Sequence, residues 1–199
     1  KGNRKIGLGV MGFADLLIKL GIPYDSERAV ALAEKIMDFI QQRARTASIQ
    51  LAEQRGPFPN WEKSIYRGQI KLRNATLTTI APTGTISIIA GTSSGIEPLF
   101  ALAYVRNVLN DDKLPELHPV FLEVAKKRGF YSTAMIQRLI QQGSVRGLEE
   151  IPEDVQAIFA TAHDIDPKWH IRMQAAFQKH TDNAVSKTVN APHDATIDD

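Results

Sequence analysis

The sequence is organised around one stretch, Arg73-Asn-Ala-Thr-Leu-Thr-Thr-Ile-Ala-Pro-Thr-Gly-Thr-Ile-Ser-Ile-Ile-Ala-Gly-Thr-Ser-Ser-Gly-Ile-Glu-Pro98. Its apolar and β-branched run from Leu77 to Ile80 predicts a short strand. A polar turn at residues 82–85 follows, where a proline and a glycine favour a change of chain direction. A second apolar segment and a loop rich in glycine and serine complete the stretch. We therefore expect a strand that ends in a hydroxyl-rich turn.

The composition of this turn suits an anion. Gly84 allows backbone N–H groups to face a ligand, and the hydroxyls of Thr83, Thr85 and Ser87 are neutral donors that can hold phosphate oxygens. Threonine and glycine are also ordinary turn residues, so composition leaves a purely structural turn as an equal alternative.

The order of the residues distinguishes these alternatives. The segments Arg73-Asn-Ala-Thr-Leu77, Ala81-Pro-Thr-Gly-Thr-Ile-Ser87 and Ser93-Ser-Gly-Ile-Glu-Pro98 closely resemble the catalytic subunit of ribonucleotide reductase, in particular its adenosylcobalamin-dependent class. The runs at residues 4–15 and 170–190 resemble the same family. In that family this turn binds the phosphates of the substrate nucleotide, which implies a substrate site at Pro82, Thr83, Gly84, Thr85 and Ile86, with Ser87 adjoining.

The resemblance also implies a fold and a reaction. It implies an α/β fold in which residues 1–199 are a single, helix-rich section from the C-terminal part of a ten-stranded α/β barrel, without a second domain. The family reduces a ribonucleoside di- or triphosphate by a thiyl-radical mechanism, with adenosylcobalamin as cofactor of the parent enzyme, a thioredoxin-type reductant and a homodimer as one expected assembly. This chain has no cysteine. It therefore lacks the radical residue and the reducing pair, and we expect no catalytic residue within it.

The composition sets further limits. With 43% hydrophobic and 23% charged residues, the chain is typical of a soluble domain with one core, and no apolar run predicts a membrane span or a signal peptide. The net charge of +2 comes from interleaved acids and bases, which does not indicate a nucleic-acid surface. The absence of cysteine excludes a disulfide scaffold. We expect a cytoplasmic protein, and the first residue, Lys1, favours a section of a longer one.

The glycines Gly7, Gly9 and Gly12 form a G-x-G-x-x-G pattern, which is also found in dinucleotide-binding folds. That motif requires a full strand before the first glycine and an acid after a second strand, and neither is visible here. The pattern instead predicts close backbone packing before a short helix that ends at Gly21.

Helices are predicted through most of the remaining chain. Asp25 or Ser26 can cap a long helix that ends at Gly56, with one apolar stripe formed by Val30, Ala33, Met37, Ile40, Ala44, Ala47 and Leu51. Proline, serine, aspartate and glycine signals predict four more helices, at residues 120–128, at 133–142, from 153 onward and from 167 to about 180. Short strands are predicted at residues 99–105 and 185–189.

Isolated titratable residues have no arrangement that indicates catalysis or metal binding. The five histidines lack metal-ligand spacing, so we expect surface or capping roles and no metal site. Lys187 is expected at the surface of its strand. Glu97 is expected to orient the loop at Gly95 through backbone hydrogen bonds, because a carboxylate beside substrate phosphates would repel them.

One alternative to a reductase section remains open. The chain could be an α/β module that binds a phosphorylated ligand or a partner and catalyses nothing, which its lack of cysteine and of an acid–base pair favours. A nicotinamide-dependent oxidoreductase built on Gly7, Gly9 and Gly12 is a third idea, and it fails for want of the surrounding strands.

Overall fold

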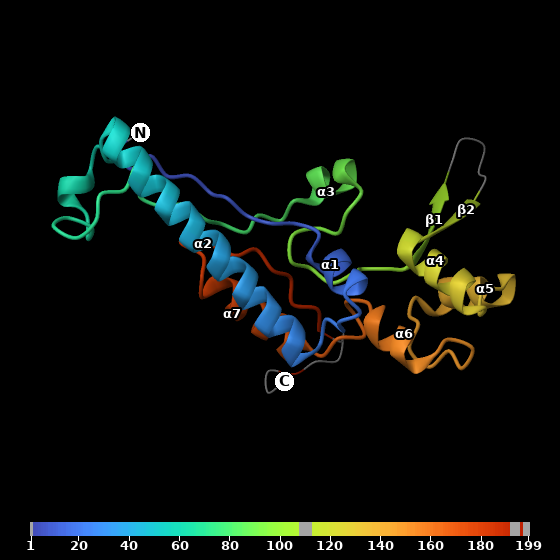
Figure 1. The fold of residues 1–199 in the computed structure, drawn as a ribbon. Coiled ribbons are helices and arrows are strands. Elements are labelled where there is room, and N and C mark those ends of the chain that lie inside the picture. The colour runs from blue at the N-terminus through green and yellow to red at the C-terminus, as the bar shows by residue number, and fades with distance from the viewer. Residues whose placement is uncertain (1, 108–112, 192–195, 197–199) are drawn as a thin grey trace.

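The computed structural model describes residues 2–107, 113–191 and 196, without the side chains of residues 104–116 (Figure 1). Helices dominate these residues. In chain order the elements are α1 (Phe13–Lys19), α2 (Glu27–Arg55), the 3₁₀ turn η1 (Trp61–Lys63), α3 (Gly84–Ala90), β1 (Ala103–Asn107), β2 (Lys113–Leu117), α4 (Pro119–Arg128), α5 (Thr133–Gln142), α6 (Glu153–Ile158) and α7 (Pro167–Gln178).

The helix ends are set by local capping, as predicted. The hydroxyl of Ser26 accepts a hydrogen bond from Ala29 N at the start of α2, and Ser132 caps α5 in the same way. Gly129 and Gly143 adopt the left-handed conformation that ends α4 and α5. These helix predictions are confirmed.

The long helix α2 lies along α7 on one side of the molecule (Figure 1). Ala29, Ala33 and Met37 of α2 have no exposed surface and pack in one cluster with Met173 and Phe177 of α7. Burying these apolar side chains supplies the main stabilisation of the pair.

The second half of the predicted α2 stripe is wrong. Ala47 and Leu51 are exposed, whereas Ser48 and Ala52 are buried. A period of 3.6 residues carries the face of Met37 to positions 48 and 52, and a serine was not expected on an apolar face. Ser48 is buried because its hydroxyl accepts hydrogen bonds from the N–H groups of residues 73 and 74.

Three extended segments, near residues 5–10, 76–80 and 183–187, run side by side. Two isolated parallel bridges, Leu8 with Thr78 and Ile80 with Val185, join them. The strands predicted at 77–80 and 185–189 are therefore reduced to bridge residues. The reason is that side chains take the backbone donors a ladder would use: the carboxylate of Asp182 accepts from Leu77 N, and a glutamate accepts from the N–H of residue 188.

The strand predicted at residues 99–105 is displaced along the chain. It begins at Ala103 and pairs antiparallel with β2, with Ala103 opposite Leu117. Leu99 and Leu102 precede it and are buried in the core formed with α4 and α5. These two leucines therefore supply core packing rather than strand residues.

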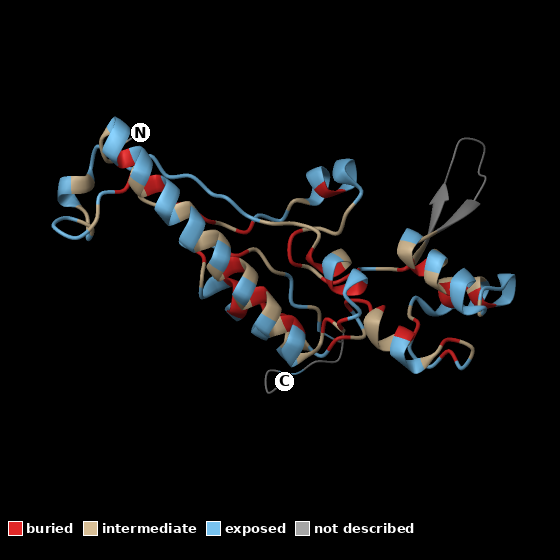
Figure 2. Ribbon diagram, in the orientation of Figure 1, coloured by how far each residue is buried: buried red, intermediate tan, exposed pale blue. Residues whose placement is uncertain are grey.

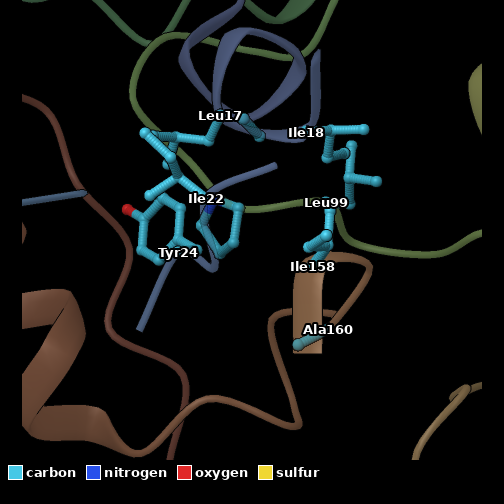
Figure 3. A pocket seen from close by; sticks show the side chains of 9 residues that line it. Leu17, Ile18, Ile22, Tyr24, Leu99, Ile158 and Ala160 are labelled. Atoms are coloured by element: carbon cyan, nitrogen blue, oxygen red, sulfur yellow. The ribbon is translucent and has the colours of Figure 1, made fainter. Parts of the chain in front are cut away.

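The buried residues form two apolar clusters, one around α1, α2 and α7 and one around α4, α5 and α6 (Figure 2). The clusters meet at a cavity of about 10 Å³, where Leu17, Ile22 and Tyr24 face Leu99 and Ile158 (Figure 3). Such a space holds at most one water molecule. It is a packing gap and not a ligand site. None of the helices described here is both long and apolar enough to cross a membrane.

Candidate functional site

The turn singled out in the sequence lies where the central extended segment ends. Thr83 adopts a left-handed backbone conformation, with φ at 57°, and α3 begins at the next residue, Gly84. The second apolar segment expected after the turn is therefore a helix. For a residue with a branched Cβ this conformation costs about 1–2 kcal/mol, and strain of this kind is concentrated at functional sites.

Backbone donors of this turn are free. Among the described residues, the N–H groups of Gly84, Thr85 and Ile86 donate to no protein acceptor, and the hydroxyl of Thr85 has no partner either. Gly84, Thr85 and Ile86 are exposed, as is Pro82. The turn thus presents three N–H groups and one hydroxyl to solvent in a short stretch of chain.

The other two hydroxyls of the predicted site are engaged. Thr83 Oγ1 accepts a hydrogen bond of 2.7 Å from Gly95 N and keeps its own proton for a further acceptor. Ser87 is 2% exposed, donates to Gly84 O at 3.0 Å, and lies 2.8 Å from the hydroxyl of Ser94. Ser87 therefore connects the turn, at Gly84, to the loop, at Ser94.

The loop Thr92–Glu97 carries the turn and is itself anchored at every residue. Asp15 Oδ2 accepts from Thr92 Oγ1 and Ser93 N, at 2.6 and 2.7 Å. The next three residues, in chain order, bond to Ser87, Thr83 and Tyr24. At Gly95, where φ is 46°, an added Cβ would lie 3.1 Å from Ala81 O. The loop therefore packs closely against the residues at the start of the turn.

Asp15 links this loop to α1 and to the segment before α4. Its carboxylate also lies 3.3 Å from His118 Nε2. Burial alone would raise the pKa of Asp15, but the hydrogen bonds from His118, Thr92 and Ser93 outweigh it and lower the pKa to about 2. Asp15 is therefore ionised at neutral pH and serves as an acceptor, not as an acid.

The last loop residue, Glu97, is held by the C-terminal extended segment. Its two oxygens accept from Lys187 Nζ at 2.6 Å and from Thr188 N at 2.7 Å. Glu97 was expected to orient this loop through backbone hydrogen bonds, and the structure shows one such bond, from Thr188 N, together with an ion pair to Lys187 that was not expected. The ion pair also offsets the negative charge that would repel phosphates.

The prediction of a surface position for Lys187 is wrong. Its side chain has no exposed surface, and its ammonium group donates to Glu97, to Thr188 O and to His170 Nδ1, the last at 2.8 Å. Because Nδ1 accepts, the proton of the neutral ring is on Nε2, which points to Ala162 O. Burial and the charge of Lys187 lower the pKa of His170. Burial also lowers the pKa of Lys187, although Glu97 opposes this.

The histidine predictions are also partly wrong. His170 is completely buried, which contradicts a surface or capping role, whereas His118 does occupy the N-cap position of α4, although its side chain contacts Asp15 instead of capping the helix. His193 lies outside the described residues. Within the part of the chain that the structure describes, no group of three His, Cys, Asp or Glu side chains could hold a metal ion.

Asp15, His170 and Lys187 were missed as site residues because each lies far from the turn in the sequence and has no motif that joins it to the turn. The sequence does contain one signal. Asp15 and Lys187 lie within the two runs, near the start and the end, that resemble the same family as the turn, so they could have been considered together with it.

The glycine pattern near the N-terminus has the structural role that was predicted. An added Cβ at Gly9 would lie 2.0 Å from Thr79 O, and one at Gly7 would lie 2.3 Å from the Thr79 side chain. Glycines are therefore required where the two extended segments touch. Beside this contact a cavity of about 250 Å³ opens toward Thr83 and Ile86.

Comparison with known proteins identifies the family. The chain belongs to the family described as ribonucleotide reductase, barrel domain, which matches residues 1–72 and 69–199. It is 54% identical over 198 residues to the vitamin B12-dependent ribonucleoside-diphosphate reductase of Thermoplasma acidophilum, covering 99% of this chain and 26% of that protein. A protein of the same name from Mycobacterium tuberculosis (strain CDC 1551 / Oshkosh) is 54% identical over 199 residues, covering 100% and 29%.

A solved structure is also similar. The Actinobacillus ureae class Id ribonucleotide reductase alpha subunit superposes with a TM-score of 0.75 at 26% identity, covering 90% of this chain and 32% of that one. The fold prediction is thus supported at the level of the family, whereas the helix-rich structure described here does not itself form a closed barrel. The chain spans less than a third of the length of each of these three relatives.

Proposed function

We propose that this chain is the part of a ribonucleoside-diphosphate reductase that holds the phosphates of the substrate nucleotide. The observation that carries the proposal is the strained turn at Thr83, beside which three N–H groups and the Thr85 hydroxyl are free in the described structure. Free backbone donors gathered in one turn form a ready anion site. Family membership supports a nucleotide as the anion.

The roles of the six residues differ. The N–H groups of Gly84, Thr85 and Ile86, with the hydroxyls of Thr83 and Thr85, donate to the phosphate oxygens. Pro82 sets the direction of the chain into the turn, and Ser87 fixes the turn on the loop below. The chain performs no bond-breaking step. It places the ribose against catalytic groups supplied by the rest of the enzyme, which lowers the entropic barrier of the reaction.

The parent enzyme is proposed to complete a ten-stranded α/β barrel in the cytoplasm and to act as a homodimer with a thioredoxin-type reductant. Adenosylcobalamin is its proposed cofactor, because two relatives that match nearly the whole chain are named vitamin B12-dependent. When bound, that cofactor supplies the radical. We assign no cobalt ligand to His118, His170 or His180, because their imidazoles already contact Asp15, Lys187 and Asp38.

The test is the Thr85→Val variant of the full-length enzyme, measured with a ribonucleoside diphosphate and with the corresponding triphosphate. Valine keeps the shape of threonine and removes the free hydroxyl. We expect KM to rise by about tenfold, the effect of one lost hydrogen bond to a charged group, with radical formation unchanged. The higher of the two wild-type kcat/KM values identifies the preferred substrate. An unchanged KM in Thr85→Val would remove the basis for this role.

A matched control is Thr46→Val, since Thr46 is exposed on α2 and its hydroxyl donates to Gln42 O. This variant makes the same chemical change away from the turn. KM should stay at the wild-type value. The non-catalytic module remains the alternative, and a full-length protein that binds nucleotide without turning it over would favour it.

A further inference from the structure

The ion pair Lys187–Glu97, in which the lysine side chain is buried and the glutamate side chain is 25% exposed, lies outside the phosphate turn but is connected to it through two residues of the loop. Gly95 donates to Thr83 Oγ1, and Ser94 contacts Ser87, so both ends of the turn rest on residues just before Glu97. The contacts that fix Glu97 therefore also fix the loop residues that support the turn.

The contacts of the pair are saturated. The ammonium group of Lys187 has three protons and three acceptors, on Glu97, His170 and Thr188. Both carboxylate oxygens of Glu97 are bonded as well. Because the ammonium group is buried and every hydrogen bond of the pair is used, its geometry is more restricted than that of an exposed pair that exchanges with water.

From this placement, and resting on the function proposed above, we infer that Lys187 and Glu97 are positioning residues for substrate binding. They fix the loop Thr92–Glu97 so that the donors of the turn converge on the phosphates. Neither residue touches the substrate. Loss of the pair lets the loop move and misplaces the donors, so it changes substrate affinity and leaves the chemical step intact once the substrate is bound.

Removing the charge of Lys187 is also expected to weaken phosphate binding through electrostatics. Without the ammonium group, the Glu97 carboxylate is left without its counter-charge in the loop that carries the turn, and its negative charge then opposes the approach of phosphate. A cavity of about 370 Å³ borders Ser94, Glu97 and Thr188, so an unpaired carboxylate would face open space on that side.

The experiment compares three variants of the full-length enzyme by steady-state kinetics with the preferred nucleotide. Lys187→Met keeps the length of the stem and removes the charge. We expect KM to rise about tenfold, the effect of one lost hydrogen bond to the charged phosphate, with kcat within about twofold of wild type. In the double variant Lys187→Met/Glu97→Gln the pair is still absent, but the unpaired charge is gone and the amide oxygen still accepts from Thr188 N, which keeps one anchor of the loop. KM should therefore recover in part, to within about threefold of wild type.

Lys179→Met is the matched control, because Lys179 pairs with Glu34 at 3.0 Å on the exposed surface of α7 and α2. Its KM and kcat should both stay unchanged. A merely structural role of Lys187 predicts a different result. The active fraction and kcat would fall in Lys187→Met, and the double variant would be no better. That result would overturn the inference.

Two further measurements keep the outcome unambiguous. If Lys187→Met does not fold, Glu97→Gln, which is isosteric, should raise KM by about threefold at constant kcat and speed amide exchange at Gly95, and an unchanged KM there would overturn the inference. Thr85→Val is measured in parallel. A raised KM in Thr85→Val with a normal KM in Lys187→Met rejects the positioning role alone, whereas normal values in both reject the phosphate site itself.

Discussion

The loop Thr92–Glu97 and the α2–α7 pair are held in place by different forces. Each residue of the loop is anchored by a specific polar contact, in part to the nearby turn and in part to distant residues such as Asp15 and Lys187. The helix pair is held by buried apolar side chains such as Met37 and Phe177, and its ion pairs lie on the surface. Directional contacts fix a position, whereas apolar burial supplies stability with little direction. The two regions should therefore respond differently to substitution.

The largest expected effect is on the stability of the helix pair. Met37 has no exposed surface, and Met37→Ala should destabilise the α2–α7 region by about 3 kcal/mol through lost burial and a new cavity. Hydrogen exchange of the α2 and α7 amides in the full-length enzyme measures this loss. The KM for the substrate should stay unchanged. A raised KM in Met37→Ala would show that the stability of the helix pair also determines substrate binding at the loop.

The second-largest effect is expected at Asp15, which anchors the loop through hydrogen bonds. The pKa of Asp15 is lowered to about 2 from an ordinary value of 3.8, so its ionised form stabilises the fold by about 2 kcal/mol at neutral pH. This contribution is complete above about pH 4 and is lost as the pH falls toward 2. Asp15→Asn should therefore speed amide exchange at Ser93 at pH 7. Equal exchange rates in variant and wild type at that pH would show that the carboxylate is not the anchor.

The smallest effect is expected at the surface of the helix pair. Arg172 donates two hydrogen bonds of 2.6 Å to the carboxylate of Glu27, and hydrogen bonding from Arg172 lowers the pKa of Glu27. Both groups are exposed, and such pairs contribute little because water and salt compete with them. Arg172→Ala should leave the midpoint of urea unfolding and the substrate KM unchanged. A shift as large as that of Met37→Ala would mean that surface charge also holds the helices together.

The helix boundaries could be predicted because they depend on neighbours in the sequence. Ser26, Ser132 and the glycines at 129 and 143 act within a few residues of themselves. The strands could not be predicted in the same way. Whether residues 77–80 form a ladder depends on what lies beside them, and there a side chain, Asp182, takes the N–H of Leu77.

For the site, the sequence by itself determined the turn, its hydroxyls and the family they resemble, because these are contained in one short stretch. It also determined that no thiol chemistry takes place in this chain, since there is no cysteine. Only the tertiary structure decided that Thr83 and Ser87 rest on the loop, and that Lys187 and His170 are buried beside Glu97. The physical reason is that the burial and pairing of a charge depend on segments some 90 residues apart. A local sequence pattern does not show which distant segments come into contact.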